Sequence, residues 1–234
     1  MSSILQNMQA VHAQIVNAAQ SAGRREGEVQ LLAVSKTFDA AAVVEAAQGG
    51  QSAFGENYLQ EALDKMAAVA DLLPEAALEW HFIGPIQSNK TRPIAEHFAW
   101  VHSVERLKIA ERLSQQRPAH LPPLNICLQI NISGEASKSG ALPEAAPALA
   151  QAIAALPGLR LRGLMAIPEP SDDPAQQRAP HRQLRELFEA LKAQGLALDT
   201  LSMGMSSDLP AAIAEGATMV RIGTAIFGKR DYAK

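Results

Sequence analysis

The sequence predicts an α/β protein, a single (β/α)8 barrel with an extra N-terminal helix, on three observations. About eight short runs rich in β-forming residues alternate with helix-type segments along the chain. The predicted strands are almost continuously apolar, which is typical of a parallel sheet covered by helices. The length of 234 residues is close to that of a typical barrel, about 250 residues. A doubly wound open sheet would show the same alternation, and the number of strands favours the barrel.

The expected elements follow one another without a linker, so we expect one domain spanning residues 1–234. The chain begins with an amphipathic helix within residues 1–23, whose apolar side chains recur at helical spacing. The expected strands cover residues 31–35, 52–54, 78–83, 100–102, 124–132, 161–167, 200–203 and 219–222, and the fifth is the longest. The expected helices cover residues 40–47, 58–69, 93–97, 105–116, 143–156, 209–215 and a long segment that includes 184–191. In such a barrel the chemistry takes place at the carboxyl ends of the strands.

Charge and composition exclude several classes of function. The 21 Lys and Arg residues against 24 Asp and Glu give a net charge of −3, which provides no basic field for gripping a nucleic acid. The single cysteine, Cys127, excludes an internal disulfide and a multi-cysteine metal site, and its apolar neighbours favour a small buried hydrophobe. The sequence contains neither a signal peptide nor an apolar run of about 20 residues. We therefore expect a cytoplasmic protein without a membrane or nucleic-acid partner.

Polar residues at the ends of the first and the last two strands are the strongest candidates for chemistry. Lys36 directly follows the first strand, where it either points into solvent or provides an amine that forms a Schiff base with an aldehyde. Arg221 lies inside the apolar last strand and needs an acceptor, either an acidic side chain or a ligand atom. Gly223 and Thr224 end that strand, and Ser202 ends the strand before it. Together they describe an anion pocket, in the usual place of a phosphate in this fold.

Other polar residues near strand ends have simpler interpretations beside the functional one. Asn57 follows the second strand, either as a turn residue that caps the next helix or as part of the site. Ser207 or Asp208 is the simplest N-cap for the helix after the seventh strand. The aromatic neighbours of His81 favour a hydrogen-bonded core histidine over a catalyst. We expect no metal site, since no pair of His or acidic residues has a metal-ligand spacing, and we find no phosphate-loop or nucleophile-elbow motif.

Five motifs, in order along nearly the whole chain, are similar to those of a known family. They are residues 33–36 (AVSK), 54–58 (FGENY), 80–90 (WHFIGPIQSNK), 202–206 (SMGMS) and 220–228 (VRIGTAIFG). These motifs resemble the pyridoxal phosphate homeostasis protein family, also known as the YggS or proline synthase co-transcribed family. The resemblance implies a single (β/α)8 barrel similar to the N-terminal domain of bacterial alanine racemase. It also implies that pyridoxal 5′-phosphate (PLP) is held as a Schiff base on a lysine at the end of the first strand.

The resemblance also implies a set of cofactor-binding residues and no catalytic residue. The set is Lys36, Asn57, Ser202, Met203, Arg221, Gly223 and Thr224. By this resemblance Lys36 carries the Schiff base, Arg221 meets the pyridine nitrogen and Asn57 lies close to the ring. The other four hold the phosphate, Met203 through its backbone. A permanently charged arginine disfavours protonation of the ring nitrogen, and an unprotonated ring is a poor electron sink.

Two classes of function then stand open, and a third is simpler. The favoured one is a PLP carrier or homeostasis protein without appreciable turnover. The alternative is a small PLP-dependent amino-acid racemase with Lys36 as one base. Alanine racemase supplies its second acid–base group, a tyrosine, with a C-terminal domain, whereas this sequence ends at Lys234, six residues after Gly228. Neither Tyr58 nor Tyr232 is an evident substitute, which favours the carrier. A phosphate-binding barrel without an aldehyde cofactor is the third interpretation.

The resemblance leaves the partners and one lysine open. PLP-dependent apo-enzymes are the candidate recipients of the cofactor, and we expect a monomer because a racemase dimerisation domain is missing. Lys138 matches a motif of the family after the fifth strand, and it is either a solvated loop lysine or a residue with a role in the site.

Overall fold

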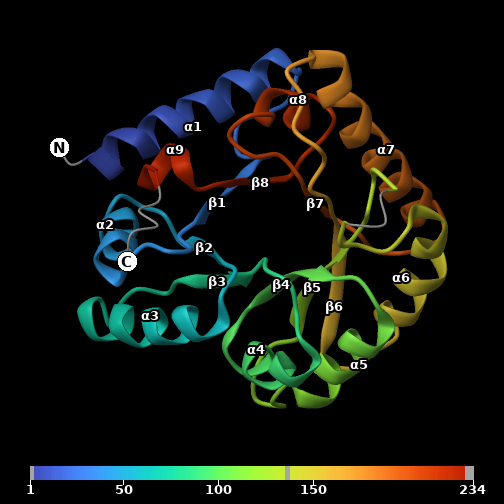
Figure 1. Cartoon of the computed structure of the whole chain (residues 1–234), viewed down its shortest axis with the longest axis horizontal. Helices are drawn as coiled ribbons and strands as arrows, with labels where there is room; N and C mark the ends of the chain where they lie inside the picture. The colour runs from blue at the N-terminus through green and yellow to red at the C-terminus, as the bar shows by residue number, and fades with distance from the viewer. Residues whose placement is uncertain (1–2, 135–137, 230–234) are drawn as a thin grey trace.

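The computed structural model describes residues 3–134 and 138–229, and its eight strands form a closed parallel barrel in sequence order. The strands are β1 (Gln30–Val34), β2 (Ala53–Glu56), β3 (Glu79–Phe82), β4 (Trp100–Val104), β5 (Leu124–Gln129), β6 (Leu159–Met165), β7 (Thr200–Ser202) and β8 (Met219–Ile222). β1 pairs with both β2 and β8, which closes the sheet. Figure 1 shows the helices around the outside of the strands. The predicted (β/α)8 barrel is confirmed.

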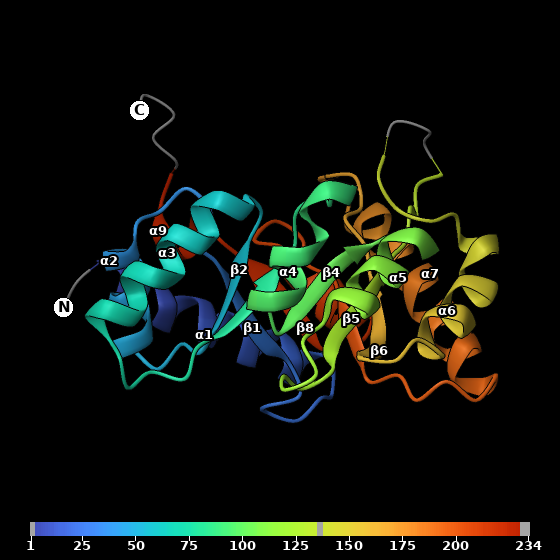
Figure 2. The same cartoon turned by 90° about the horizontal axis from the view of Figure 1, so that it is seen from below.

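Helices cover the outside of the barrel. They are α1 (Ser3–Ser21), α2 (Ala40–Gln48), α3 (Leu59–Leu72), α4 (Thr91–His97), α5 (Leu107–Gln116), α6 (Ala146–Ala154), α7 (Pro174–Ala193), α8 (Leu209–Ala214) and α9 (Thr224–Phe227), with the short 3-10 helices η1 (Ser88–Lys90) and η2 (Pro143–Ala145). α1 is the expected extra helix, and it packs against α8 and α9 (Figure 1). Figure 2 shows α4 beside α5 on one flank. None of the helices within the described ranges has the length and apolar character that a membrane span requires.

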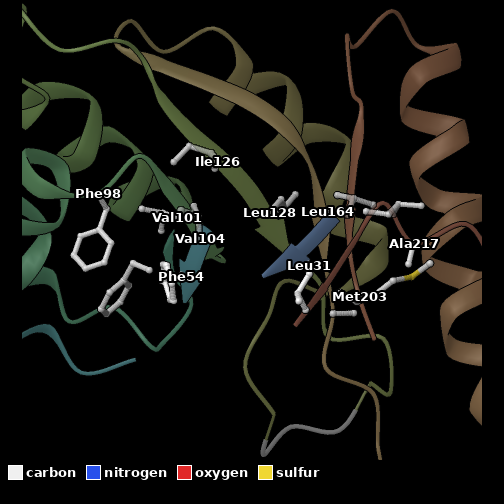
Figure 3. Close-up of a cluster of buried hydrophobic side chains, with 14 of the residues drawn as sticks. Leu31, Phe54, Phe98, Val101, Val104, Ile126, Leu128, Leu164, Met203 and Ala217 are labelled. Carbon is white, nitrogen blue, oxygen red and sulfur yellow. The ribbon is translucent and has the colours of Figure 1, made fainter. Parts of the chain in front are cut away.

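Side chains alternate along each strand between the barrel interior and the layer under the helices. The outer layer forms the main hydrophobic core and includes Leu31, Phe54, Val101, Ile126 and Leu164 (Figure 3). Their direct neighbours in sequence, Leu32, Cys127 and Met165, belong to separate clusters in the barrel interior. This period of two is the geometry of a strand. Because both faces are buried, the strands look continuously apolar in the sequence.

Polar and aromatic side chains fill part of the interior, where this fold usually places branched aliphatic residues. His81 and His102 are completely buried there, and the His81 ring stacks on Trp100 with 5.2 Å between ring centroids. The ring nitrogens of His81 contact Glu79 and His102, so the predicted hydrogen-bonded core histidine is confirmed. Cys127 is also buried, as predicted, and burial raises the pKa of its thiol to about 12.

Most element boundaries differ from the expectation by a few residues, and three differences are larger. The prediction that the fifth strand is the longest is wrong, because β5 has six residues and β6 has seven. The regular strand ends at Gln129, although the Ile130 amide still donates to the backbone oxygen of Met165 and Ile130 also forms an isolated bridge with Ala141. The helix expected over residues 143–156 is divided into η2 and α6. α9 was not expected; it follows β8 directly, with Gly223 as its N-cap residue.

Candidate functional site

Lys36 lies just beyond β1, at the mouth of the barrel. Val34 and Lys36 line the same cavity, whereas Ser35 between them points toward β2 and donates a 2.6 Å hydrogen bond from its hydroxyl to Glu56 Oε1. The alternation of the strand therefore continues for two residues past β1. Lys36 is half-buried, so the cavity wall covers part of its side chain.

A buried ion pair between β2 and α3 supports the chain that carries Lys36. Lys65 of α3 donates to Glu56 Oε1 at 2.7 Å and to the backbone oxygen of Ser35 at 2.8 Å. Both side chains of the pair are almost completely buried, with 3% of Lys65 and 0% of Glu56 exposed. Burial raises the pKa of the Glu56 carboxyl, and the Lys65 ammonium opposes that rise. The ion pair thus fixes the residue directly before Lys36.

Glu61 fixes the residue directly after Lys36. Its Oε1 accepts a 2.6 Å hydrogen bond from the Thr37 amide and a 3.0 Å hydrogen bond from Lys65. Thr37 has a φ of 70°, an uncommon value for a residue with a Cβ. The hydrogen bond from its amide to Glu61 stabilises this backbone conformation. Sequence reasoning missed these supports, although a lysine on the buried face of α3 was a signal.

A cavity of about 320 Å³ opens at the carboxyl ends of the strands, where the site was expected. Its walls contain five of the seven predicted cofactor-binding residues, namely Lys36, Asn57, Arg221, Gly223 and Thr224. These come from the segments after β1 and β2 and from the end of β8. Small-molecule sites commonly have volumes of about 300–1,000 Å³. The cavity therefore suits a small ligand.

The Arg221 guanidinium lies in the cavity wall and is bonded to oxygens at the ends of β6 and β7. Nη1 donates to the backbone oxygen of Ser202 at 2.6 Å and to its hydroxyl at 2.8 Å, and Nη2 donates to the backbone oxygen of Ala166 at 2.9 Å. No carboxylate within the described segments forms an ion pair with Arg221. Burial lowers the pKa of Arg221 to about 10, so the guanidinium stays protonated at neutral pH.

Ser202 and Met203, the other two predicted cofactor-binding residues, are not among the residues that line this cavity. Ser202 is completely buried inside the barrel, where its hydroxyl accepts from Arg221 and contacts His102 Nδ1 at 2.8 Å. The Met203 side chain lies in the outer hydrophobic layer (Figure 3), and its amide donates to the backbone oxygen of Met219. β7 ends at Ser202, and the bonds of these polar groups lie within the sheet and the barrel interior.

Ser206 and Ser207 occupy the place that was expected for Ser202. Both are exposed, and both line the cavity. The loop reaches the mouth through Gly204, whose φ of 99° is rarely adopted by residues with a side chain. A Cβ at Gly204 would also lie 2.6 Å from the Cβ of Ala212. The sequence contains both serines in its SMGMSS motif, but the end of the strand decides which serine faces the cavity.

Asp208 holds this loop instead of capping α8. Asp208 is the residue before α8, but its side chain makes no capping bond to the helix. Its Oδ1 accepts a 2.7 Å hydrogen bond from the Met205 amide, and its Oδ2 lies 2.9 Å from His181 Nε2 of α7. Burial opposes ionisation, yet the hydrogen bonds from His181 and Met205 lower the pKa of Asp208. A carboxylate that binds two neighbours fixes the loop that carries Ser206 and Ser207.

Asn57 lies in the cavity wall and has one unpaired acceptor. It does not cap the next helix, because α3 begins at Leu59 after Tyr58 and has no side-chain cap. Asn57 Oδ1 is buried and has no hydrogen-bond partner among the residues that the structure describes. Gly84 packs against it so closely that a Cβ there would overlap the backbone oxygen of Asn57. A buried, unpaired oxygen in a cavity wall indicates a ligand contact.

A second cavity of about 360 Å³ adjoins the first and shares Asn57, Ile83 and Ile167 with it. Its wall contains Lys138, whose ammonium lies 3.2 Å from Glu169. Lys138 therefore lies beside the candidate site, with 28% of its side chain exposed.

Comparison with known proteins shows the family of this chain. The family model described as alanine racemase, N-terminal domain, matches residues 6–231. The pyridoxal phosphate homeostasis protein of Pseudomonas aeruginosa is 67% identical over 232 residues, which is 99% of this chain and 98% of the relative. The protein of the same name from Escherichia coli strain K12 is 55% identical over 234 residues and the full length of both chains.

Solved structures show the same fold. PipY of Synechococcus elongatus with PLP bound is 38% identical, with a TM-score of 0.83 over 96% of this chain and 100% of PipY. An alanine racemase of Clostridium difficile is 14% identical, with a TM-score of 0.72 over 95% of this chain and 57% of the racemase. The second likeness concerns the fold alone. The chain belongs to the family of pyridoxal phosphate homeostasis proteins, whose barrel matches the N-terminal domain of alanine racemase.

Proposed function

We propose that this chain is a cytoplasmic PLP-binding protein that takes part in PLP homeostasis without appreciable catalytic turnover. The observation that carries the proposal is the convergence of Lys36, Asn57, Arg221, Gly223 and Thr224 on one cavity of about 320 Å³. The names of the bacterial relatives and the PLP bound to PipY support the choice of ligand.

The groups in the cavity wall fit the three parts of PLP, an aldehyde, a pyridine ring and a phosphate. Lys36 offers an amine for the aldehyde. Ile83 and Ile167 offer apolar walls for the ring, and Asn57 adds a polar amide beside them. Polar groups from the segments after β7 and β8 remain for the phosphate, so each part of the cofactor finds matching chemistry.

In this proposal Lys36 holds PLP covalently. Bound PLP would supply an aldehyde, and Lys36 would hold that aldehyde as a Schiff base through its Nζ atom. Ser35 and Thr37 on either side are fixed by Glu56 and Glu61. The turn therefore presents Lys36 without a rearrangement of the backbone, which lowers the cost of binding.

The phosphate is held by Gly223, Thr224, Ser206 and Ser207. Gly223 and Thr224 begin α9, and the first amides of a helix have no partner within it. Such amides bind anions. The Thr224 hydroxyl and the two serines add donors from the other side of the cavity. This assignment keeps the predicted phosphate end of the site and replaces the contacts expected from Ser202 and Met203.

Arg221 meets the pyridine nitrogen and keeps the site catalytically quiet. PLP supplies an electron sink for chemistry at a substrate α-carbon, and a fixed positive charge beside the ring nitrogen weakens that sink by disfavouring a proton there. Among the described residues of the cavity wall, Lys36 and Arg221 are the ones with ionisable side chains. A racemase needs a further acid–base group. The wall thus supports binding without turnover over the racemase alternative.

The covalent link is tested with an absorbance spectrum before and after borohydride reduction, followed by peptide mapping. We expect the reduced cofactor on Lys36. Lys36→Ala should lose the reducible absorbance while the fold persists, and the matched variant Lys138→Ala, beside the neighbouring cavity, should keep it. A reducible cofactor on another lysine in Lys36→Ala would contradict this placement, and a colourless parent protein would support a phosphate-binding barrel without an aldehyde.

The absence of turnover and the fate of PLP need separate tests. Incubation of the PLP-loaded chain with each L-amino acid should leave the D-enantiomer undetected, and rapid formation of a D-amino acid would favour the racemase.

PLP-dependent apo-enzymes are the proposed recipients, and the exposed Tyr58 and Ile167 near the mouth offer an apolar surface for them. The loaded chain, which we propose to be a monomer, should reactivate such an apo-enzyme.

A further inference from the structure

An unbroken line of polar side chains crosses the barrel interior below the candidate site. Glu79 Oε1 lies 2.9 Å from His81 Nε2, and His81 Nδ1 lies 2.8 Å from His102 Nε2. His102 Nδ1 lies 2.8 Å from Ser202 Oγ, which accepts from Arg221 Nη1 at 2.8 Å. The residues come from β3, β4, β7 and β8, and the first two strands lie across the closed barrel from the last two (Figure 1).

The middle of this line is shielded from water, and its ends are not. His81, His102 and Ser202 are 0% exposed. Glu79 has 42% of its side chain exposed, and Arg221 lines the cavity at the mouth. The line therefore connects the candidate site with the surface at the amino-terminal end of β3. Each buried polar group along it must be satisfied by its neighbour, because an unpaired one is costly.

The available N–H and O–H protons allow the hydrogen bonds of this line to run in only one direction. Arginine only donates, so Ser202 Oγ accepts from Arg221 and has its own single proton left for His102 Nδ1. A neutral His102 then carries its proton on Nε2 and donates to His81 Nδ1. A neutral His81 in turn donates from Nε2 to Glu79. The reverse order would place an unprotonated His81 nitrogen 2.9 Å from an ionised carboxylate, with two acceptors facing each other.

The charges along the line agree with this direction. Burial lowers the pKa of His81 and of His102, so both rings are neutral at neutral pH. The hydrogen bond from His81 lowers the pKa of the Glu79 carboxyl and keeps it ionised. Arg221 is protonated, as described above. The line thus joins a cation at the site to an anion at the opposite end of the barrel through neutral donors.

The distance between the two charges matters for the site. A carboxylate in direct contact with Arg221 would neutralise the guanidinium where a ligand meets it. Within the described segments Arg221 donates to oxygens of Ser202 and Ala166 and forms no direct ion pair, and the Asp208 carboxylate favours its protonated form through space. A remote carboxylate can favour the buried cation through aligned hydrogen bonds and still leave its charge available to the cavity.

We propose that Glu79, His81, His102 and Ser202 are positioning residues that form a one-directional hydrogen-bond relay, which orients the Arg221 guanidinium toward the cavity and ends on a carboxylate at the far end of the barrel. The proposal rests on the proposed function, in which Arg221 meets bound PLP. The relay explains why part of the barrel interior is polar. Aliphatic side chains would be enough if the interior only had to be filled.

The direction of the relay is tested on the full chain without PLP. Nitrogen-15 NMR of histidine-labelled protein reports which ring nitrogen carries the proton, and His81→Gln and His102→Gln assign the signals. At neutral pH we expect both rings to be neutral with the proton on Nε2. A proton on Nδ1, or a doubly protonated ring, at either position would overturn the relay.

The action of the relay on Arg221 is tested through PLP binding to variants at its exposed end. Glu79→Gln keeps an acceptor for His81 and removes the charge, and Glu79→Leu removes both. We expect PLP affinity to fall roughly fivefold to tenfold in Glu79→Leu, the value of about one net hydrogen bond, and less in Glu79→Gln. The absorption band of bound PLP should shift in the same order, because the environment of the ring nitrogen changes with Arg221.

Cys127→Ala is the matched control, because Cys127 packs beside Trp100 in the interior and lies outside the relay. It should lose stability with the PLP affinity and the absorption band unchanged. His102→Phe breaks the relay in its middle and, if it folds, should behave like Glu79→Leu. The relay is overturned if Glu79→Leu behaves like Cys127→Ala. If the parent chain bound no PLP, the proposed function would fail, and the histidine NMR alone would decide on the relay.

Discussion

A hydroxyl that binds the phosphate of PLP should matter for the phosphorylated ligand and not for pyridoxal. Thr224 is exposed at the start of α9 and lines the cavity. A hydrogen bond to a charged acceptor contributes roughly 1.5–3 kcal/mol, so we expect Thr224→Val to weaken PLP binding by about tenfold or more. Titration of the variant with PLP and with pyridoxal measures the difference. Ser206→Ala should also weaken PLP binding more than pyridoxal binding, by a factor no larger than that of Thr224→Val.

Ser202→Ala separates this prediction from a general effect on the pocket. The Ser202 hydroxyl is bonded to Arg221 and His102 and does not reach the cavity. Its removal should therefore weaken PLP and pyridoxal to the same extent, through Arg221. Equal weakening of both ligands in Thr224→Val, or a loss specific to PLP in Ser202→Ala, would contradict the placement of the phosphate.

The candidate residues that could be predicted from the sequence are those whose position relative to the end of a strand is enough to place them at the site. Lys36, Arg221 and Thr224 stand at or near the carboxyl ends of strands, and in a parallel barrel all carboxyl ends open at the same mouth. The direction of Ser202 could not be predicted, because a shift of one residue in the end of a strand turns its side chains over. The pairing of His81 with His102 depends on contacts between different strands, which no local pattern contains.

At the scale of elements, β2 and α3 are joined by the buried pair of Glu56 and Lys65. Lys65→Met removes the ammonium and leaves Glu56 buried with the Ser35 hydroxyl as its remaining partner. Removal of one partner of a buried ion pair typically costs about 3–5 kcal/mol. We expect a loss of this size in the free energy of unfolding, measured by urea denaturation. PLP binding should also weaken, because Lys65 holds the backbone oxygen of Ser35.

The double variant Lys65→Met/Glu56→Leu is the control for this prediction. A buried pair that is replaced by apolar residues often costs little or nothing. The double variant should therefore regain much of the stability that the single variant loses, while the support of the Lys36 turn stays lost. A Lys65→Met protein with unchanged stability would show that the pair contributes no more than an exposed one.

The elements themselves were largely predictable, because strands buried on both faces and amphipathic helices leave clear patterns. Their ends were less so. β5 stops at Gln129, and the next residue, Ile130, forms a bridge with Ala141, a contact between segments that a local pattern does not contain. α9 has four residues, which is too short for a helical period to appear in the sequence.

On the scale of the whole molecule, the barrel must be stable with a polar line through its interior. The outer hydrophobic layer between strands and helices supplies the main core (Figure 3). Inside, stability depends on every polar group keeping its partner, because a buried donor or acceptor without one is costly. Conditions that change the protonation of the interior should therefore destabilise the entire fold.

Acid should lower the free energy of unfolding below about pH 6.5, because of the interior histidines. Burial holds the pKa of His81 and of His102 in the folded chain below the usual 6.5. The unfolded chain takes up both protons below about pH 6.5 and the folded chain does not, so stability falls as pH decreases, by at most about 1.4 kcal/mol per pH unit for each ring. Above 6.5 the contribution is complete. Urea unfolding at about pH 7.5, 6.5 and 5.5 measures the slope.

The variant of an exposed histidine, His97→Gln, should keep this slope, and His102→Phe should reduce it by about half. A free energy of unfolding that does not change between about pH 6.5 and 5.5 would mean that the folded interior binds protons as readily as the unfolded chain.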